Sequence, residues 1–122
     1  MKYLLLIYSE EARWAKMTEA ESGQVSAEYM KYTKDIHRSG HWVAGDALQP
    51  TATATSVRVR DGKTLATDGP FAETREQLGG FYLVEAKDLD EAIALAARIP
   101  SVRFGTIEVR PIMVTPRPAE MT

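Results

Sequence analysis

Two short segments of this 122-residue chain are apolar at every position, so each would bury side chains on both of its faces. They run from Tyr3 to Tyr8 and from Phe81 to Val84. Successive side chains of a strand point to opposite faces, and a run that is apolar on both alternations indicates a strand covered on two sides. The chain therefore predicts a sheet whose central strands are covered both above and below.

The first predicted helix begins at Thr18, which has Glu21 three residues later in the spacing of a capping box. Apolar residues then follow at steps of four, three and four, which gives the helix one face to pack on the sheet. These residues are Val25, Tyr29, Tyr32 and Ile36. Gly40 is expected to end the helix as a C-terminal cap.

The second predicted helix begins at Asp88, with Glu91 in the reciprocal position, and stops at Pro100. Its buried side is expected to contain Leu89, Ile93, Ala96 and Ile99.

The apolar run at Phe81 belongs to a strand over residues 79–85, and three further segments complete the predicted fold. They are residues 41–48, residues 57–65 folded as a hairpin about Asp61-Gly62, and residues 106–114. Residues 9–16, which include Trp14, are expected to form a polar connection, and residues 51–55 an extended edge. The order predicts a ferredoxin-like βαββαβ arrangement of the α+β class with an inserted hairpin. One domain would span residues 1–114, followed by a Pro- and Thr-containing tail at 115–122.

The faces of this sheet predict an assembly. Two helices can cover one side only, yet the central strands are apolar on both, and an uncovered apolar sheet would exceed the patch that monomers usually expose. A homodimer packed sheet against sheet is therefore expected.

Composition and charge argue against several classes of partner and cofactor. The formal net charge is −2 and there is no long basic run, which argues against nucleic acid and an anionic membrane as partners. The chain has no cysteine, and neither of its two histidines has a metal-binding spacing, so no metal or other cofactor is expected. The apolar run after Met1 ends at Ser9-Glu10-Glu11 and is short for a signal peptide, so we expect a cytoplasmic protein.

Three motifs carry a family resemblance: DGPFAETREQLGGFYLVEA from Asp68, DLDEAIALAARIP from Asp88, and GTIEVRPI from Gly105. Together with the opening KYLLLIY, they make the chain resemble the YCII-related proteins, in the branch named after its DGPF motif. The resemblance implies a dimeric α/β barrel. It also implies a regulatory alternative, because DGPF-type proteins resemble partners encoded beside extracytoplasmic-function sigma factors.

The chain departs from this family at one pair of residues. YCII proteins outside the DGPF branch have a His early in the first helix and an Asp before a late Pro. Here Ile99 precedes Pro100, and the helix has no His near Met30. The acid–base chemistry of such a pair is therefore not carried over.

Asp68 is the candidate catalytic residue. An acid in the turn Asp68-Gly69-Pro70, beside Phe71, could accept a proton in an apolar surrounding. The alternative is that its carboxylate only holds the turn.

Four residues are candidate ligand contacts. Trp42, Phe71 and Tyr82 would suit the wall of an apolar pocket, and are alternatively core or interface aromatics. Arg110 could hold an anionic group, or pair with Glu108 on the same face of the last strand. His41 and Asp46, five positions apart in a strand, are expected on opposite faces.

Two functions remain open from the sequence. The first is small-molecule binding in a cleft between helix and sheet, with cofactor-free acid–base chemistry. The second is a non-enzymatic accessory or regulatory module that binds a sigma-factor-related partner.

Overall fold

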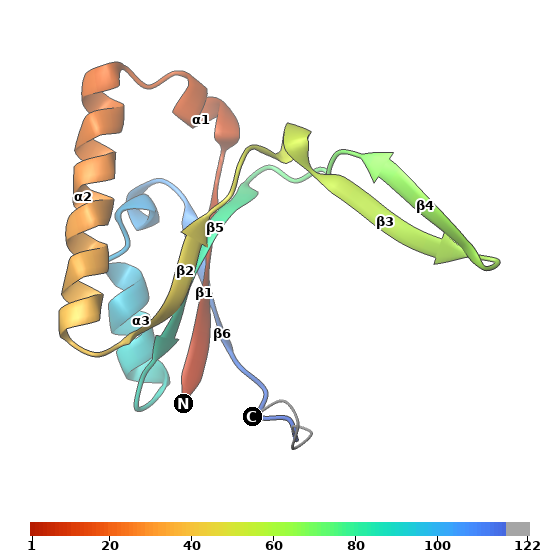
Figure 1. Cartoon of the computed structure of the whole chain (residues 1–122). Coiled ribbons are helices and arrows are strands. Elements are labelled where there is room, and N and C mark those ends of the chain that lie inside the picture. The colour runs from red at the N-terminus through yellow and green to blue at the C-terminus, as the bar shows by residue number, and fades with distance from the viewer. Residues whose placement is uncertain (117–122) are drawn as a thin grey trace.

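The computed structural model describes residues 1–116, and within them the fold is a mixed α+β sandwich of one sheet and its helices (Figure 1). Four antiparallel strands lie in the order β2-β5-β1-β6, and a separate pair, β3-β4, projects from them. The strands are β1 (Lys2–Ser9), β2 (Trp42–Ala47), β3 (Thr55–Arg60), β4 (Lys63–Asp68), β5 (Gln77–Glu85) and β6 (Thr106–Pro111). The helices are α1 (Glu11–Ala15), α2 (Glu19–Arg38) and α3 (Leu89–Ala97), with the 3-10 turns η1 (Thr51–Thr53) and η2 (Pro100–Arg103).

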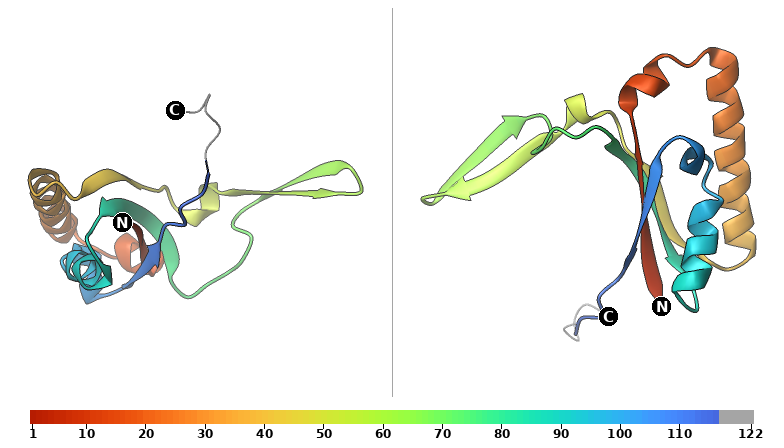
Figure 2. Two further views of the ribbon diagram at one scale, coloured as in Figure 1. Left: turned by 90° about the horizontal axis from the view of Figure 1, so that it is seen from below. Right: turned by 180° about the vertical axis from the view of Figure 1, so that it is seen from behind.

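The predicted two-faced strands β1 and β5 lie at the centre of the sheet, next to each other. Tyr3, Leu5 and Ile7 point to one face, are buried, and lie beneath α2 and α3. Leu4 and Leu6 point to the opposite face and are half-buried. Both helices cover the same side of the sheet (Figure 2), so the second side has no helix on it in the described chain.

The predicted start and end of α2 are confirmed. The Thr18 hydroxyl accepts the backbone N–H of Glu21 at 3.1 Å, and the Glu21 carboxylate accepts that of Thr18, also at 3.1 Å. Gly40 follows the helix with φ of 80°, an angle that side chains disfavour. Val25, Tyr32 and Ile36 are buried, as their spacing predicts, and the fourth residue of that face, Tyr29, is partly buried against the core.

The predicted buried face of α3 is partly wrong. Leu89 and Ile93 are each 49% exposed, whereas Ala92, Leu95 and Ala96 are buried. Asp88 caps the helix as expected by accepting the Glu91 N–H at 2.9 Å, but the Glu91 carboxylate accepts the N–H of Lys87 and not that of Asp88. Ala92, Leu95 and Ala96 belong to the same core cluster as Leu5 and Ile36, so this face of the helix packs on the sheet and the face with Leu89 and Ile93 does not.

Strands β3 and β4 form the predicted hairpin, which we call the arm (residues 55–68). Asp61 and Gly62 have φ of 52° and 73°, as a two-residue hairpin of type I′ requires. The arm projects from the sheet on the side opposite the helices (Figures 1 and 2). At its root the Gly69 N–H donates to the Ala54 carbonyl at 2.7 Å, so the two ends of the arm lie side by side.

Three predicted segments differ from the structure. The expected polar connection after β1 contains α1, and the expected edge at 51–55 begins as η1. Strand β6 ends at Pro111, before the expected residue 114. Most of the predicted tail, residues 117–122, lies outside the described residues.

Candidate functional site

A cleft of about 930 Å³ lies between the sheet and the helices α1 and α2. Its floor comes from β1, β2 and β5, its side from α2 and its roof from α1. The side chains and backbone that line it belong to Ile7, Ser9, Glu11, Ala12, Trp14, Ala15, Tyr29, Thr33, Trp42, Gly45, Asp46, Ala47, Leu48, Pro50, Gln77, Gly79, Gly80, Phe81, Tyr82 and Ser101. Both tryptophans of the chain are among them.

Aromatic rings form the inner wall of the cleft. Trp42 and Tyr82 meet edge to face, with ring centroids 6.0 Å apart, and the other side of Trp42 stacks on His37 at 4.3 Å. A Cβ atom at Gly45 would lie 2.8 Å from the Tyr82 ring and 2.9 Å from that of Trp42. The glycine therefore gives the two rings the room they need to meet.

The roof is held over the cleft by polar contacts at its ends. The Trp14 indole N–H donates to the Ser9 hydroxyl at 2.8 Å, and its ring lies edge-on to Phe104 at 5.4 Å. The Glu11 carboxylate accepts the N–H and the hydroxyl of Thr51 at 2.8 and 2.6 Å. This last contact joins α1 to η1.

Two pairs of hydroxyl groups supply polarity inside the cleft. The Tyr29 hydroxyl lies 2.5 Å from that of Ser101, and the Thr33 hydroxyl 2.7 Å from that of Tyr82. Burial raises the pKa of Tyr29 and of Tyr82 above the ordinary tyrosine value, against the opposing effect of each hydrogen bond. Both phenols therefore stay protonated at neutral pH.

The ionisable side chains that line the cleft are acidic or phenolic. No Lys, Arg or His side chain is among the lining residues of the described chain. Asp46 pairs in register with Phe81, beside the Gly45–Tyr82 pair that faces the helices, so its side chain points to the opposite face of the sheet. Glu11 is the acid on the helix side, and Thr51 occupies both of its oxygens.

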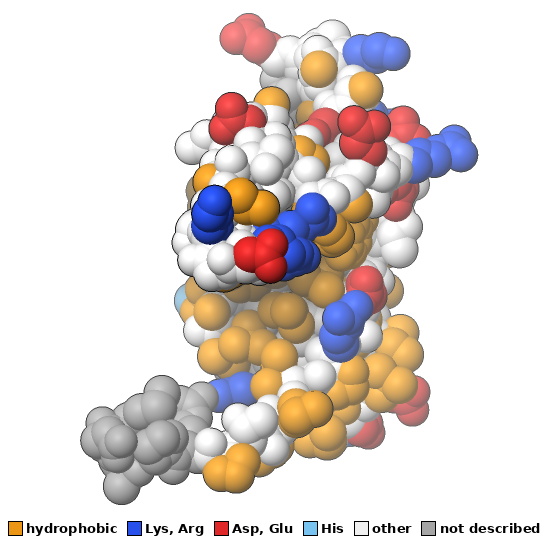
Figure 3. All heavy atoms as spheres, turned by 90° about the vertical axis from the view of Figure 1, so that its right-hand side faces the viewer, with side chains coloured by type: hydrophobic (Ala, Val, Ile, Leu, Met, Phe, Trp, Pro, Cys, Tyr) orange, Lys and Arg blue, Asp and Glu red, His pale blue; other side chains and the backbone are white. Residues whose placement is uncertain are grey.

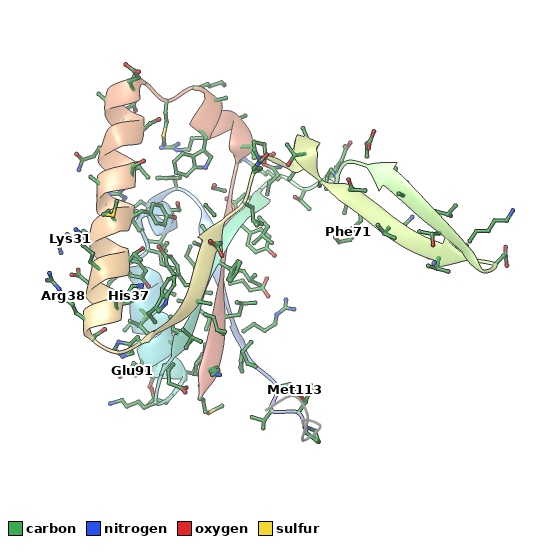
Figure 4. The ribbon with its side chains drawn as sticks, in the orientation of Figure 1. Lys31, His37, Arg38, Phe71, Glu91 and Met113 are labelled. Carbon is green, nitrogen blue, oxygen red and sulfur yellow. The ribbon has the colours of Figure 1, made fainter. Side chains whose placement is uncertain are left out.

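The structure brings together two of the five site residues expected from the sequence. Trp42 and Tyr82 lie in the cleft wall. Asp68 is exposed at the end of β4, and Phe71 is 81% exposed just beyond it, far from α2 (Figure 4). Arg110 lies on β6, where it pairs with Glu108.

These three residues do not line the cleft. No hydrogen bond to the Asp68 carboxylate occurs within residues 1–116, so a turn-holding role through that group has no contact to support it. The roles of Asp68, Phe71 and Arg110 stay predictions.

Sequence reasoning missed four residues that shape the cleft: Trp14, Tyr29, Thr33 and Ser101. Tyr29 was expected as part of the helix face that packs on the sheet, and Thr33 follows it by four positions, which is the spacing of neighbours on one helix face. Ser101 has no such signal, because it reaches the cleft through η2, which is 72 residues away from Tyr29 in sequence.

His41 makes different contacts from those weighed in the sequence. Its Nδ1 lies 2.6 Å from the Ser39 hydroxyl and its Nε2 lies 3.3 Å from the Glu91 carboxylate. These contacts join the end of α2 to the start of α3, outside the cleft, and Asp46 takes no part in them.

Across residues 1–116 there is no group of three or more His, Cys, Asp or Glu side chains placed to hold a metal ion. Over the same range no helix combines the length and the apolar character needed to cross a membrane.

Comparison with known proteins gives the family. Residues 1–116 match the YCII-related domain. An uncharacterised protein of Rhizobium meliloti (strain 1021) is 33% identical over 123 residues, a match that covers 99% of this chain and 98% of that protein. The family match covers most of the chain and the relative aligns along nearly all of it, so the chain belongs to the YCII-related domain family.

Proposed function

We propose that this protein binds a small molecule in the cleft between α1, α2 and the sheet. The observation that carries the proposal is the combination of a volume of about 930 Å³, an aromatic wall and a few polar groups. Ligand sites in proteins have this size and this mixture of apolar walls with sparse, fixed polar groups. The family match adds no ligand, because it comes with an uncharacterised relative.

Binding is placed ahead of catalysis. The acid inside the cleft, Glu11, has both oxygens engaged by Thr51, and the buried phenols of Tyr29 and Tyr82 are donors rather than bases at neutral pH. Cofactor-free acid–base chemistry would have to use the lone pairs that Thr51 leaves free on Glu11, or Asp68 acting from outside the cleft.

The test is a ligand screen that reads melting temperature and tryptophan fluorescence together. A ligand of the native state raises the melting temperature by mass action, and both tryptophans line the cleft. Ala15→Leu should abolish the hits, since this residue lines the cleft from α1 and a larger side chain there would take space that a ligand needs. Ala20→Leu makes the same change on an exposed part of α2 outside the cleft and should keep them. Hits that survive Ala15→Leu would reject the cleft as the site.

We also propose a ferredoxin-like fold that assembles as a homodimer through the uncovered side of the sheet. The strand order β2-β5-β1-β6 with helices on one side supports the fold assignment. The uncovered side, which we call the open face, carries half-buried apolar side chains. They are Leu4, Leu6, Tyr8, Phe81 and Leu83. Figure 3 shows hydrophobic side chains gathered on this side of the molecule, below the arm.

Two open faces packed together would give the dimeric α/β barrel implied by the DGPF motif at residues 68–71. The arm supports this geometry. Its six residue pairs span roughly 20 Å, and packed sheets lie about 10 Å apart, so an arm on the open side is long enough to reach past a partner's sheet.

Sedimentation equilibrium tests the dimer. Leu6→Glu would place a charge in the middle of the open face and should give a monomer. Ile93→Glu adds the same charge at an exposed position of α3 and should leave a dimer. A wild-type monomer at micromolar concentration, or a dimeric Leu6→Glu variant, would overturn this part of the proposal.

The second candidate function is a regulatory module, and the arm is the observation that favours it. One face of the arm carries Val57 and Val59, which are 63% and 58% exposed, and the other carries the cations Arg58, Arg60 and Lys63. Such a ribbon suits a protein partner, and an extracytoplasmic-function sigma factor is the one proposed.

Excision of the arm tests this second candidate. Residues 55–68 can be removed because Ala54 and Gly69 are already hydrogen-bonded neighbours. Calorimetric titration with the purified sigma factor encoded nearest to this protein should show binding that the arm-deleted variant lacks. No binding by the intact chain would reject the regulatory role.

A further inference from the structure

We propose that the ligand of the cleft is an uncharged, flat, largely apolar ring compound that carries two acceptor oxygens, one for each hydroxyl pair. This inference rests on the proposed binding function and names the chemical class for the same site. It is carried by the hydrogen-bonding state of four side chains: Tyr29 with Ser101, and Thr33 with Tyr82.

Each hydroxyl pair retains a hydrogen that the pair itself cannot use. Two hydroxyl groups bring two hydrogens, and the contact between them consumes one. Within residues 1–116 neither Tyr29 nor Ser101 makes a second side-chain hydrogen bond, and the same holds for Thr33 and Tyr82. An unmatched polar hydrogen in an apolar cleft is costly, and water or a ligand oxygen must take it.

The pairs act as donors toward a ligand. The phenols are held in the protonated form by burial, which raises the pKa of both tyrosines. Ser101 is 1% exposed and Tyr82 7%, so their hydroxyl groups are fixed by packing. A ligand therefore meets two preset donor positions and gains most if it presents an acceptor to each.

The charges and donor groups of the cleft favour a neutral ligand over an ion of either sign. An anion would lack a positively charged partner, because no Lys, Arg or His among residues 1–116 lines the cleft. A cation would find Glu11, whose oxygens already accept two hydrogen bonds from Thr51, but it would also face the donor hydrogens of the two hydroxyl pairs, which oppose a positive charge. A neutral ligand needs no side chain of opposite charge in the cleft, so neither condition weakens its binding.

The walls favour a flat ring. Trp42 and Tyr82 present one ring edge-on to the other, and Gly45 keeps the space between them free of a side chain. Trp14 lies across the cleft in the roof. Aromatic walls with this spacing favour a planar apolar body over a flexible chain.

The experiment measures dissociation constants for four probes of similar size by calorimetric titration. 1,4-Naphthoquinone, 1-tetralone and naphthalene carry two, one and no carbonyl oxygens, and 1-naphthoate carries a charge. The chain has no cysteine, so the quinone has no thiol to modify. Affinity should fall about three- to tenfold with each oxygen removed, the range expected for one hydrogen bond, and the anion should bind most weakly.

Tyrosine variants connect the oxygens to the hydroxyl pairs. A single Tyr→Phe change would leave the partner hydroxyl free to donate, so Tyr29→Phe is combined with Ser101→Ala and Tyr82→Phe with Thr33→Val. Each double variant should weaken the quinone about three- to tenfold while leaving naphthalene unchanged. Tyr32→Phe is the matched control, because the Tyr32 hydroxyl donates to the Leu95 carbonyl at 2.8 Å and does not line the cleft. Melting curves of each variant establish that it is folded.

The outcomes separate this inference from the proposed function. If naphthalene binds as tightly as the quinone, or 1-naphthoate binds best, the ligand class is wrong while the cleft remains a binding site that Ala15→Leu blocks. If no probe binds and the ligand screen also gives no cleft-dependent hit, both fail.

Discussion

Trp42 and Tyr82 meet edge to face across two neighbouring strands, and the contact exists because residue 45 has no side chain. The ring centroids are 6.0 Å apart, with planes inclined at 73°. Gly45 pairs in register with Tyr82, so any Cβ there would point at both rings. The aromatic wall of the cleft thus depends on one glycine in an ordinary strand conformation.

Gly45→Ala is expected to destabilise the protein by about 1–3 kcal/mol, the usual cost of forcing an extra carbon into a packed site. The new methyl would lie 2.8–3.0 Å from Tyr82, Trp42 and the Phe81 carbonyl, closer than such atoms approach. Urea denaturation gives the free energy of unfolding. Gly23→Ala in α2 is the control: nothing lies within 4 Å of its added carbon, and stability should rise by about 0.5–1 kcal/mol. Equal effects at the two sites would contradict the steric explanation.

Acid should weaken the contact between α2 and η2. Arg103 donates two hydrogen bonds to Glu28, at 2.7 and 2.9 Å, and these bonds lower the pKa of Glu28 below its ordinary value of 4.5. The folded state therefore holds the proton less tightly than the unfolded chain. The contribution to stability is present above pH 4.5 and is lost as the pH falls through the lowered folded pKa.

The measurement for Glu28 is the midpoint of urea unfolding as a function of pH. Glu28→Gln should have a lower urea midpoint than the wild type near neutral pH. Its midpoint should also fall less than that of the wild type as the pH is lowered. Glu73→Gln removes a carboxylate from an exposed segment and should leave the decline as it is in the wild type. A steep acid decline that persists in Glu28→Gln would assign the effect to other carboxylates.

Alkaline pH should destabilise the wall and side of the cleft. Burial raises the pKa of Tyr29 and Tyr82 above the ordinary value of 10, so the folded state keeps these protons longer than the unfolded chain does. The stability that comes from the two neutral phenols is complete below pH 10 and is lost as the pH rises through the folded pKa values.

Melting temperatures between about pH 9 and 11 test this linkage. The double variant Tyr29→Phe/Tyr82→Phe should lose less stability over that range than the wild type. Tyr8→Phe, on the open face, is the matched control and should behave like the wild type. If the double variant declines as steeply as the wild type, other groups determine the alkaline limit.

The capping box at Thr18 should contribute measurably to stability. Thr18→Ala removes the acceptor for the Glu21 N–H and is expected to cost about 1 kcal/mol. Thr18→Ser keeps a hydroxyl at the same position and should retain most of that amount. The comparison uses urea denaturation, and an unchanged Thr18→Ala variant would show that water replaces the cap at no cost.

The sequence determined the parts of this protein whose physics is local. The capping box of Thr18 and Glu21, the C-terminal glycine at residue 40 and the hairpin at Asp61-Gly62 are all present as expected. Each depends on contacts between residues within about four positions of one another, which a single sequence displays directly. The strands that contain Tyr3–Tyr8 and Phe81–Val84 also lie at the centre of the sheet, as predicted. This could be read from the sequence because successive side chains of a strand alternate between its two faces, so adjacent residues alone show that both faces are apolar.

Tertiary structure decided which of several acceptable surfaces is used. Helix α3 has apolar residues on two faces, and packing against the core of the sheet and α2 buries Ala92 and Leu95 and leaves Leu89 and Ile93 half exposed. Short helix α1 has a charged start and no buried residue, so its position depends on distant contacts such as that between Glu11 and Thr51.

The cleft is the clearest case of this division. Trp42 and Tyr82 could be proposed from their residue type, but their partners could not, because Tyr29 meets Ser101 across 72 positions and Thr33 meets Tyr82 across 49. From the sequence, the residue type gives the chemistry available to a side chain, and the spacing gives the neighbours it has within its own helix or strand. Only the packing of α2 and η2 on the sheet brings these hydroxyls together, since a contact between distant segments costs chain entropy that the whole core must repay.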